Sequence, residues 1–154
     1  MLSPRLPEKV LLPMHVMSPV LGALALISVS DPALALDAWK PSTERGLPVL
    51  ELASDAGKLR LVCDPDRVFG PTPNGAVVVT FVKDAQPDMI VFLAKTGEQA
   101  RLPVRGGIAA QSAAEAADWA AMVALLRRGG SFAVVTSKDS LTFETAPLPD
   151  LACE

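Results

Sequence analysis

Downstream of residue 46, short apolar or alternating segments are separated by turn-forming residues, a pattern that is typical of β-strands. Two segments, residues 76–83 (AVVVTFVK) and 89–95 (MIVFLAK), are apolar on both faces and rich in β-branched residues, which predicts central strands. The remaining predicted strands are residues 47–53, 58–64, 99–105, 131–137 and 140–146. Strands in succession favour a mainly β fold, an antiparallel β-sandwich or barrel of about seven strands.

Single residues refine this pattern. Pro103 favours an edge position for its strand, because proline has no amide proton for a neighbouring strand. Lys138 and Asp139 join the last two segments, which predicts a β-hairpin. The alternation along this hairpin places Phe132 and Phe143 on its inner face.

One segment departs from the β pattern and predicts an α-helix packed on the sheets. Ser112 is followed three residues later by Glu115, the spacing of a capping box, and strong helix formers come next. Gly129 is a suitable residue for the end of the helix, which we place at residues 112–128. The apolar residues at helical spacing are Trp119, Met122, Val123 and Leu126. We expect this side to face the core and the Trp119 indole to be largely buried.

The first 35 residues have the order of a secretory signal peptide. Arg5 and Lys9 precede an apolar stretch at residues 16–30, and Ala33 and Ala35 supply small residues before the expected cleavage point. The alternative is a retained membrane anchor, which needs about 20 apolar residues. We predict a cleaved leader and a single exported domain over residues 36–154, periplasmic or secreted, without a transmembrane span.

Cys63 and Cys153 are the two cysteines of the chain. In an oxidising compartment such a pair predicts a disulfide, which here would join the first part of the β domain to its end. The alternative is a reactive or metal-binding thiol, but the sequence has no CxxC motif.

The composition argues against several classes of function. The net charge is −3, which argues against nucleic-acid binding, and the one histidine is His15 in the leader. The domain therefore lacks the commonest general base and metal ligand, and we predict neither catalysis nor a cofactor or metal. Asp64 and Asp66 flank Pro65 and could contribute to a cation site, but acidic residues beside proline are also typical of turns.

Four basic residues are the candidate binding residues. Lys58 and Arg60 share one face of their predicted strand, and Arg101 and Arg105 share one face of theirs. They form either a solvated face with counterions or a binding face for an acidic protein, a phosphate group or an anionic envelope polymer. The choice depends on whether the two strands are neighbours.

The order of features resembles the invasion-associated locus B family. The resemblance rests on the leader, Trp39, the strand LRLVCD at 59–64, the helix with Trp119 and the terminal LPDLAC at 148–153. It implies a small exported β-sandwich protein with an envelope or host-interaction role and no established catalytic residues.

Together, these features predict an exported binding or accessory protein without catalytic activity, involved in host interaction or secretion. One alternative is a periplasmic inhibitor of a lysozyme-type enzyme, with residues 68–75 as the loop to inspect. A further alternative is a small hydrolase that uses two carboxylates.

Overall fold

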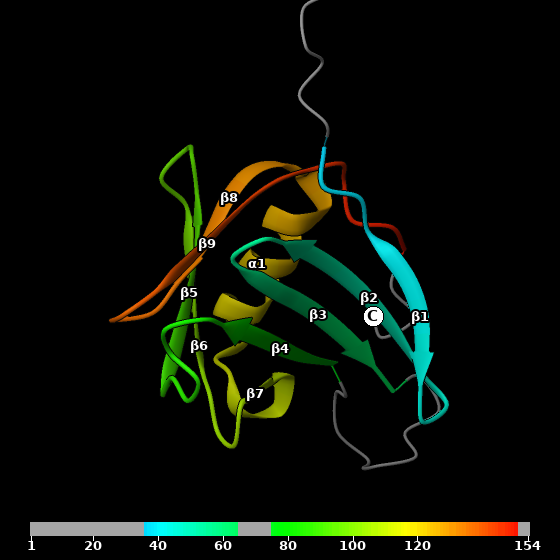
Figure 1. The fold of residues 1–154 in the computed structure, drawn as a ribbon, viewed down its shortest axis with the longest axis horizontal. Helices are drawn as coiled ribbons and strands as arrows, with labels where there is room; N and C mark the ends of the chain where they lie inside the picture. The colour runs from blue at the N-terminus through cyan, green and yellow to red at the C-terminus, as the bar shows by residue number, and fades with distance from the viewer. Residues whose placement is uncertain (1–35, 65–74, 151–154) are drawn as a thin grey trace, which may run out of the picture. The chain divides into compact units, whose positions relative to one another are not determined.

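The computed structural model describes residues 36–64 and 75–150, which form two antiparallel sheets and one α-helix (Figure 1). The described strands are β1 (Lys40–Glu44), β2 (Leu47–Ser54), β3 (Gly57–Cys63), β4 (Gly75–Phe81), β5 (Met89–Ala94), β6 (Gln99–Pro103), β7 (Ile108–Ala110), β8 (Gly130–Val135) and β9 (Ser140–Thr145). This arrangement confirms the predicted mainly β fold and is consistent with a β-sandwich that carries one helix.

One sheet has five strands in the order β1-β2-β3-β4-β7. Its first and last strands were not predicted from the sequence. β1 is exposed along its whole length and has no apolar alternation, so only its pairing with β2 reveals it. Arg45 (φ 52°) and Gly46 (φ 84°) join the two strands with positive φ at both positions, which fits a tight hairpin turn.

The second sheet has four strands in the order β6-β5-β8-β9. β6 lies at an edge, as Pro103 predicted, and β8 and β9 form the predicted hairpin. β4 and β5 each lie between two neighbours, which confirms them as central strands. β5 pairs with β8, which begins more than thirty residues later in the chain. Local sequence patterns do not specify this contact.

The helix α1 (Ala116–Arg128) begins four residues later than the sequence predicted. Ser112 lies instead in a short 3₁₀ turn (Gln111–Ala113), and Glu115 is the N-cap without a side-chain capping bond. The Gln111 side-chain oxygen accepts a hydrogen bond of 2.8 Å from the Gly75 amide. This contact with β4 accounts for the separate turn, because it ties residue 111 to the sheet before the helix starts.

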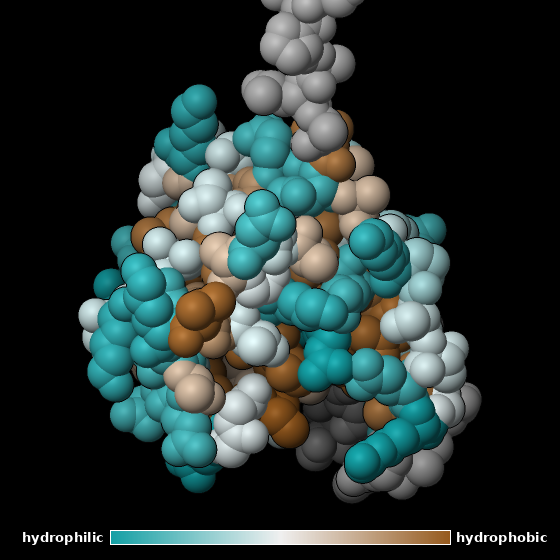
Figure 2. All heavy atoms as spheres, viewed as in Figure 1, coloured by the Kyte–Doolittle hydropathy of each residue, from teal (hydrophilic) through white to brown (hydrophobic). Residues whose placement is uncertain are grey.

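The core lies between the two sheets and α1, which passes behind β2, β3 and β4 in Figure 1. Phe132 and Phe143 are buried as predicted, with ring centroids 5.4 Å apart. The helix buries Met122, Leu125 and Leu126. Figure 2 shows hydrophilic side chains over much of one face of the molecule, with apolar residues between them.

Trp119 packs against the core with most of its surface buried, which agrees with the prediction that its indole is largely buried. It packs against the edge of the core, where an added Cβ on Gly75 would lie only 2.4 Å from the Trp119 ring. The smallest residue is therefore needed at Gly75 to admit the indole. The position of Trp119 near the start of α1 leaves part of the ring outside the sandwich.

Several predictions fall wholly or partly outside the described residues: the leader, Asp66, most of the 68–75 loop and Cys153. Cys63 is buried, with 1% of its surface exposed, and its pairing with Cys153 stays a prediction. Within residues 36–64 and 75–150, no helix is long and apolar enough to cross a bilayer.

Candidate functional site

The structure places the four predicted binding residues in two separate regions. Lys58 and Arg60 lie on β3 of the five-stranded sheet, whereas Arg101 lies on β6 of the four-stranded sheet. Arg105 lies in the turn after β6, where its backbone pairs with Ile108. Since β3 and β6 belong to different sheets, the four cations do not share one sheet face.

The two cations of β3 are paired with acids from β2 and β1 of the same sheet. Lys58 Nζ lies 3.3 Å from a Glu51 carboxylate oxygen, and Arg60 donates to Glu44 at 2.7 Å. Exposed pairs of this kind contribute little to stability, about 0 to 1 kcal/mol, but they cancel the local positive charge. This region therefore matches the solvated face with counterions that the sequence left open.

The acidic residues provide no described metal site. Asp64 is buried, but no group of three or more potential ligands among residues 36–64 and 75–150 could hold a metal ion.

A small pocket opens where α1 ends and β8 begins, and we call it the α1–β8 pocket. It has a volume of about 200 Å³ and is lined by residues of the β5–β6 turn, the end of α1 and the start of β8: Ala94, Lys95, Thr96, Leu125, Arg128, Gly129, Gly130 and Ser131. The lining combines two cations and two hydroxyl groups with the apolar side chains of Ala94 and Leu125. These are groups that bind a carboxylate or a phosphate.

Two consecutive glycines shape the pocket. Gly129 (φ 70°) and Gly130 (φ 86°) turn the chain from α1 into β8, and both have backbone angles that disfavour other residues. An added Cβ on Gly129 would lie 2.6 Å from the Pro147 backbone nitrogen, whereas one on Gly130 would meet nothing within 4 Å. Gly129 is thus packed against the segment after β9, and Gly130 faces open space.

An ion pair fixes one wall of the pocket. Arg128 donates two hydrogen bonds of 2.8 Å to the two carboxylate oxygens of Glu98, and the Thr96 hydroxyl also donates to Glu98. The Arg128 hydrogen bond, followed by the one from Thr96, holds the pKa of Glu98 below its usual value. The same contact raises the pKa of Arg128. The guanidinium is therefore held in one orientation.

Lys95 is the unpaired cation of this pocket. It is exposed in the turn between β5 and β6 and forms no ion pair with any described residue. Its charge is available to an incoming anion, while Arg128 is shared with Glu98. The sequence did not indicate this site, because Lys95 looked like an ordinary turn residue and Arg128 like a residue favoured by the helix end.

No protein-family model, curated protein or solved structure matches this chain. The resemblance to the invasion-associated locus B family therefore stays a prediction.

Proposed function

We propose that this chain is an exported binding protein that recognises an anionic group of its partner in the α1–β8 pocket. The observation that carries the proposal is the meeting of Lys95, Thr96, Arg128 and Ser131 around one small cavity. The leader and the family resemblance support export and a binding role in the envelope, without catalysis.

The size of the pocket favours a small group. Pockets for whole cofactors and drug-sized ligands have volumes of about 300 to 1,000 Å³. A cavity of about 200 Å³ suits a single carboxylate or phosphate that belongs to a larger partner. Lys95 supplies the free charge, and the Ser131 hydroxyl can donate a hydrogen bond to the anion.

The test is an NMR titration of isotope-labelled exported chain with acetate and with inorganic phosphate, and chloride at the same ionic strength as the control. We expect saturable shifts of the Lys95, Thr96 and Ser131 amides. Lys95→Ala should weaken binding by about tenfold, or about 1.4 kcal/mol. Lys83→Ala removes another exposed lysine and should change nothing. Equal shifts with chloride, or unchanged binding by Lys95→Ala, would contradict the proposal.

One observation favours inhibition of a lysozyme-type enzyme as a second candidate. Arg45 is exposed in the β1–β2 hairpin turn, where its positive φ of 52° is unfavourable for a residue of this kind. A cation at a hairpin tip suits insertion into an acidic cleft. Inhibition of peptidoglycan hydrolysis that is lost in Arg45→Gly would support it, and no inhibition by the wild-type chain would exclude it.

A further inference from the structure

The outer face of the four-stranded sheet carries an apolar stripe on its two central strands. The cross-strand register aligns Val91 with Val135 and Leu93 with Ala133, and Met89 continues the same face of β5. Met89 is 43% exposed and Leu93 is 36% exposed. We call these five residues, Met89, Val91, Leu93, Ala133 and Val135, the β5–β8 stripe.

The stripe runs into the α1–β8 pocket. Leu93 is two residues before Lys95, and Ala133 is two residues after Ser131. The Lys95 amide donates to the Ser131 carbonyl at 3.4 Å, which joins the two strands at the pocket end. The stripe residues Leu93 and Ala133 therefore adjoin Lys95 and Ser131, which line the pocket.

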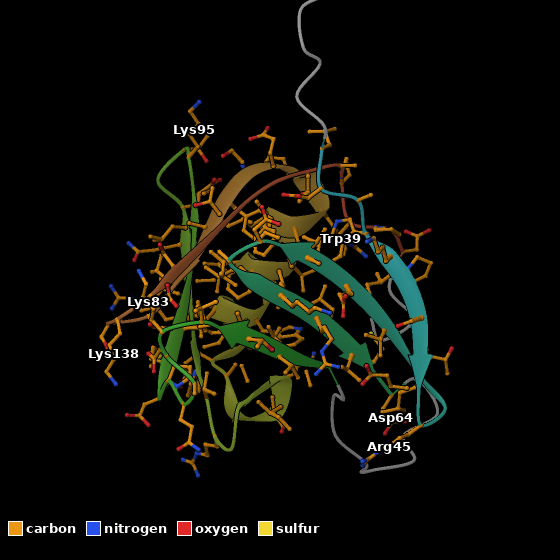
Figure 3. All side chains as sticks on the ribbon, in the orientation of Figure 1. Trp39, Arg45, Asp64, Lys83, Lys95 and Lys138 are labelled. Atoms are coloured by element: carbon orange, nitrogen blue, oxygen red, sulfur yellow. The ribbon has the colours of Figure 1, made fainter. Side chains whose placement is uncertain are left out.

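Cations lie around this surface. Lys95 lies at the pocket end, and Arg101 lies beside Val91 in the register of β5 and β6. The Arg101 side chain donates only to the neutral Gln99 among the described residues. At the other end, Lys138 in the hairpin turn lies 3.8 Å from the buried Asp84, and Figure 3 shows Lys95 and Lys138 at opposite ends of the same side of the molecule.

The β9 side of the face carries hydroxyl groups and acidic residues. On β9, Ser140 and Thr142 lie next to Val135 and Ala133, and Glu144 lies next to Ser131. The carboxylate of Asp139 accepts from the Lys83 and Ser140 amides, which holds the Asp139 pKa below its usual value. The cations Lys95 and Arg101 therefore lie on the β5 and β6 side of this face, whereas the carboxylates of Asp139 and Glu144 lie on its β9 side.

The edges of this sheet are less accessible than its face. On β6, the Arg101 amide donates to the Asp118 carboxylate of α1 at 2.9 Å. On β9, the Asp37 amide donates to the Glu144 carbonyl at 2.6 Å, and the Asp37 side chain accepts from the Glu144 amide. These contacts occupy backbone groups on both edges, which disfavours strand addition there and favours a partner on the face.

We propose that the β5–β8 stripe and the α1–β8 pocket together dock a short acidic and apolar segment of a partner protein. The inference rests on the proposed function. An acidic side chain of the segment enters the pocket, and apolar side chains at alternate positions lie on the stripe. Because β5 has six residues, the matching segment is about 20 Å long at about 3.3 Å per residue.

A peptide fits this face better than an anionic membrane does. Membrane-binding surfaces use clusters of about 4 to 8 basic residues. Here Lys95, Arg101 and Lys138 are spread around the stripe, and one of them already contacts an acid. A pocket with room for one acidic group also indicates recognition of a specific side chain.

The experiment selects a phage-displayed library of random linear peptides on the exported chain. We expect enriched peptides to carry an acidic residue followed by apolar residues at alternate positions. Leu93→Ser and Lys95→Glu should each weaken binding of a synthesised enriched peptide by about tenfold. The matched controls are Val82→Ser, which removes an exposed apolar side chain outside the stripe, and Lys40→Glu on the other sheet. Neither control should change binding.

Three results would overturn the inference: no enrichment, enriched peptides without acids, or binding that Leu93→Ser leaves intact. Two further arms examine other occupants. If the wild-type chain bound vesicles that contain phosphatidylglycerol and Leu93→Ser abolished this binding, the partner would be a membrane. If light scattering showed a dimer that Leu93→Ser abolished, the partner would be a second copy of the chain. Failure of the acetate and phosphate titrations contradicts the proposed function itself. Anion binding that persists while Leu93→Ser has no effect on peptide binding contradicts only this inference.

Discussion

The outer faces of the two sheets both carry basic side chains, yet only one face leaves them available. On the five-stranded sheet, Lys58 and Arg60 contact Glu51 and Glu44 of β2 and β1. On the four-stranded sheet, Arg101 has the apolar Val91 as its cross-strand neighbour. Whether a basic residue on a strand is free or neutralised therefore depends on the other strands of its sheet, which its own alternating pattern does not specify.

A covalent link is the first expected difference between the sheets. Cys63 lies on β3, and the four strands of the other sheet contain no cysteine. If Cys63 pairs with Cys153 as predicted, Cys153→Ser should lower the free energy of unfolding by about 2 to 5 kcal/mol. Urea denaturation measures this change. Two free thiols in freshly exported protein would contradict the pairing, and neither sheet would then carry a covalent crosslink.

The glycine pair at the pocket should show the next largest effect. Gly129→Ala adds a Cβ to a residue with positive φ and places it 2.6 Å from the Pro147 backbone nitrogen. We expect a loss of about 2 to 5 kcal/mol, the sum of backbone strain and overpacking. Gly130→Ala is the control, because its Cβ meets nothing within 4 Å, so only strain of about 1 to 2 kcal/mol applies. Equal losses of stability for the two variants in thermal unfolding would show that the segment at Pro147 moves to accommodate the added Cβ.

A double-mutant cycle measures whether the basic residues of each sheet are neutralised by an acid. Lys58→Ala and Glu51→Ala, singly and together, should give a coupling free energy of about 0.2 to 1 kcal/mol that decreases at high salt. Arg101→Ala and Glu144→Ala provide the comparison on the four-stranded sheet, where no ion pair joins the two residues. Their coupling should be near zero. A coupling as large as that of Lys58 and Glu51 would mean that Arg101 is neutralised as well.

The smallest expected effect concerns the pH response of the pocket. Arg128 lowers the pKa of Glu98 in the folded chain, so the unfolded chain takes up a proton at higher pH than the folded chain does. The stabilisation is present above the ordinary value of 4.5 and is lost as pH falls through the lower folded value. NMR titration of the Glu98 carboxyl should report this value. Arg128→Gln should move it back toward 4.5, and an unchanged value would show that the ion pair is absent in solution.

Much of the fold could be predicted because its cause is local. The double apolar runs at β4 and β5, Pro103 in β6 and the residues between β8 and β9 express backbone and burial preferences of neighbouring positions. The same reasoning failed for β1, which has no buried residue. It also failed for the helix start, where Gln111 binds the Gly75 amide across the fold.

The candidate site depended almost entirely on tertiary structure. The sequence alone determined that the chain has a signal-like leader, one histidine outside the predicted domain, two cysteines and a succession of strands around one helix. The tertiary structure decided which cations are neutralised, that Lys95 meets Arg128 and Ser131 at one pocket, and that Leu93 and Ala133 lie side by side. Strand periodicity fixes which face a side chain occupies, but the order of strands in a sheet fixes its neighbours, and that order comes from contacts between distant segments.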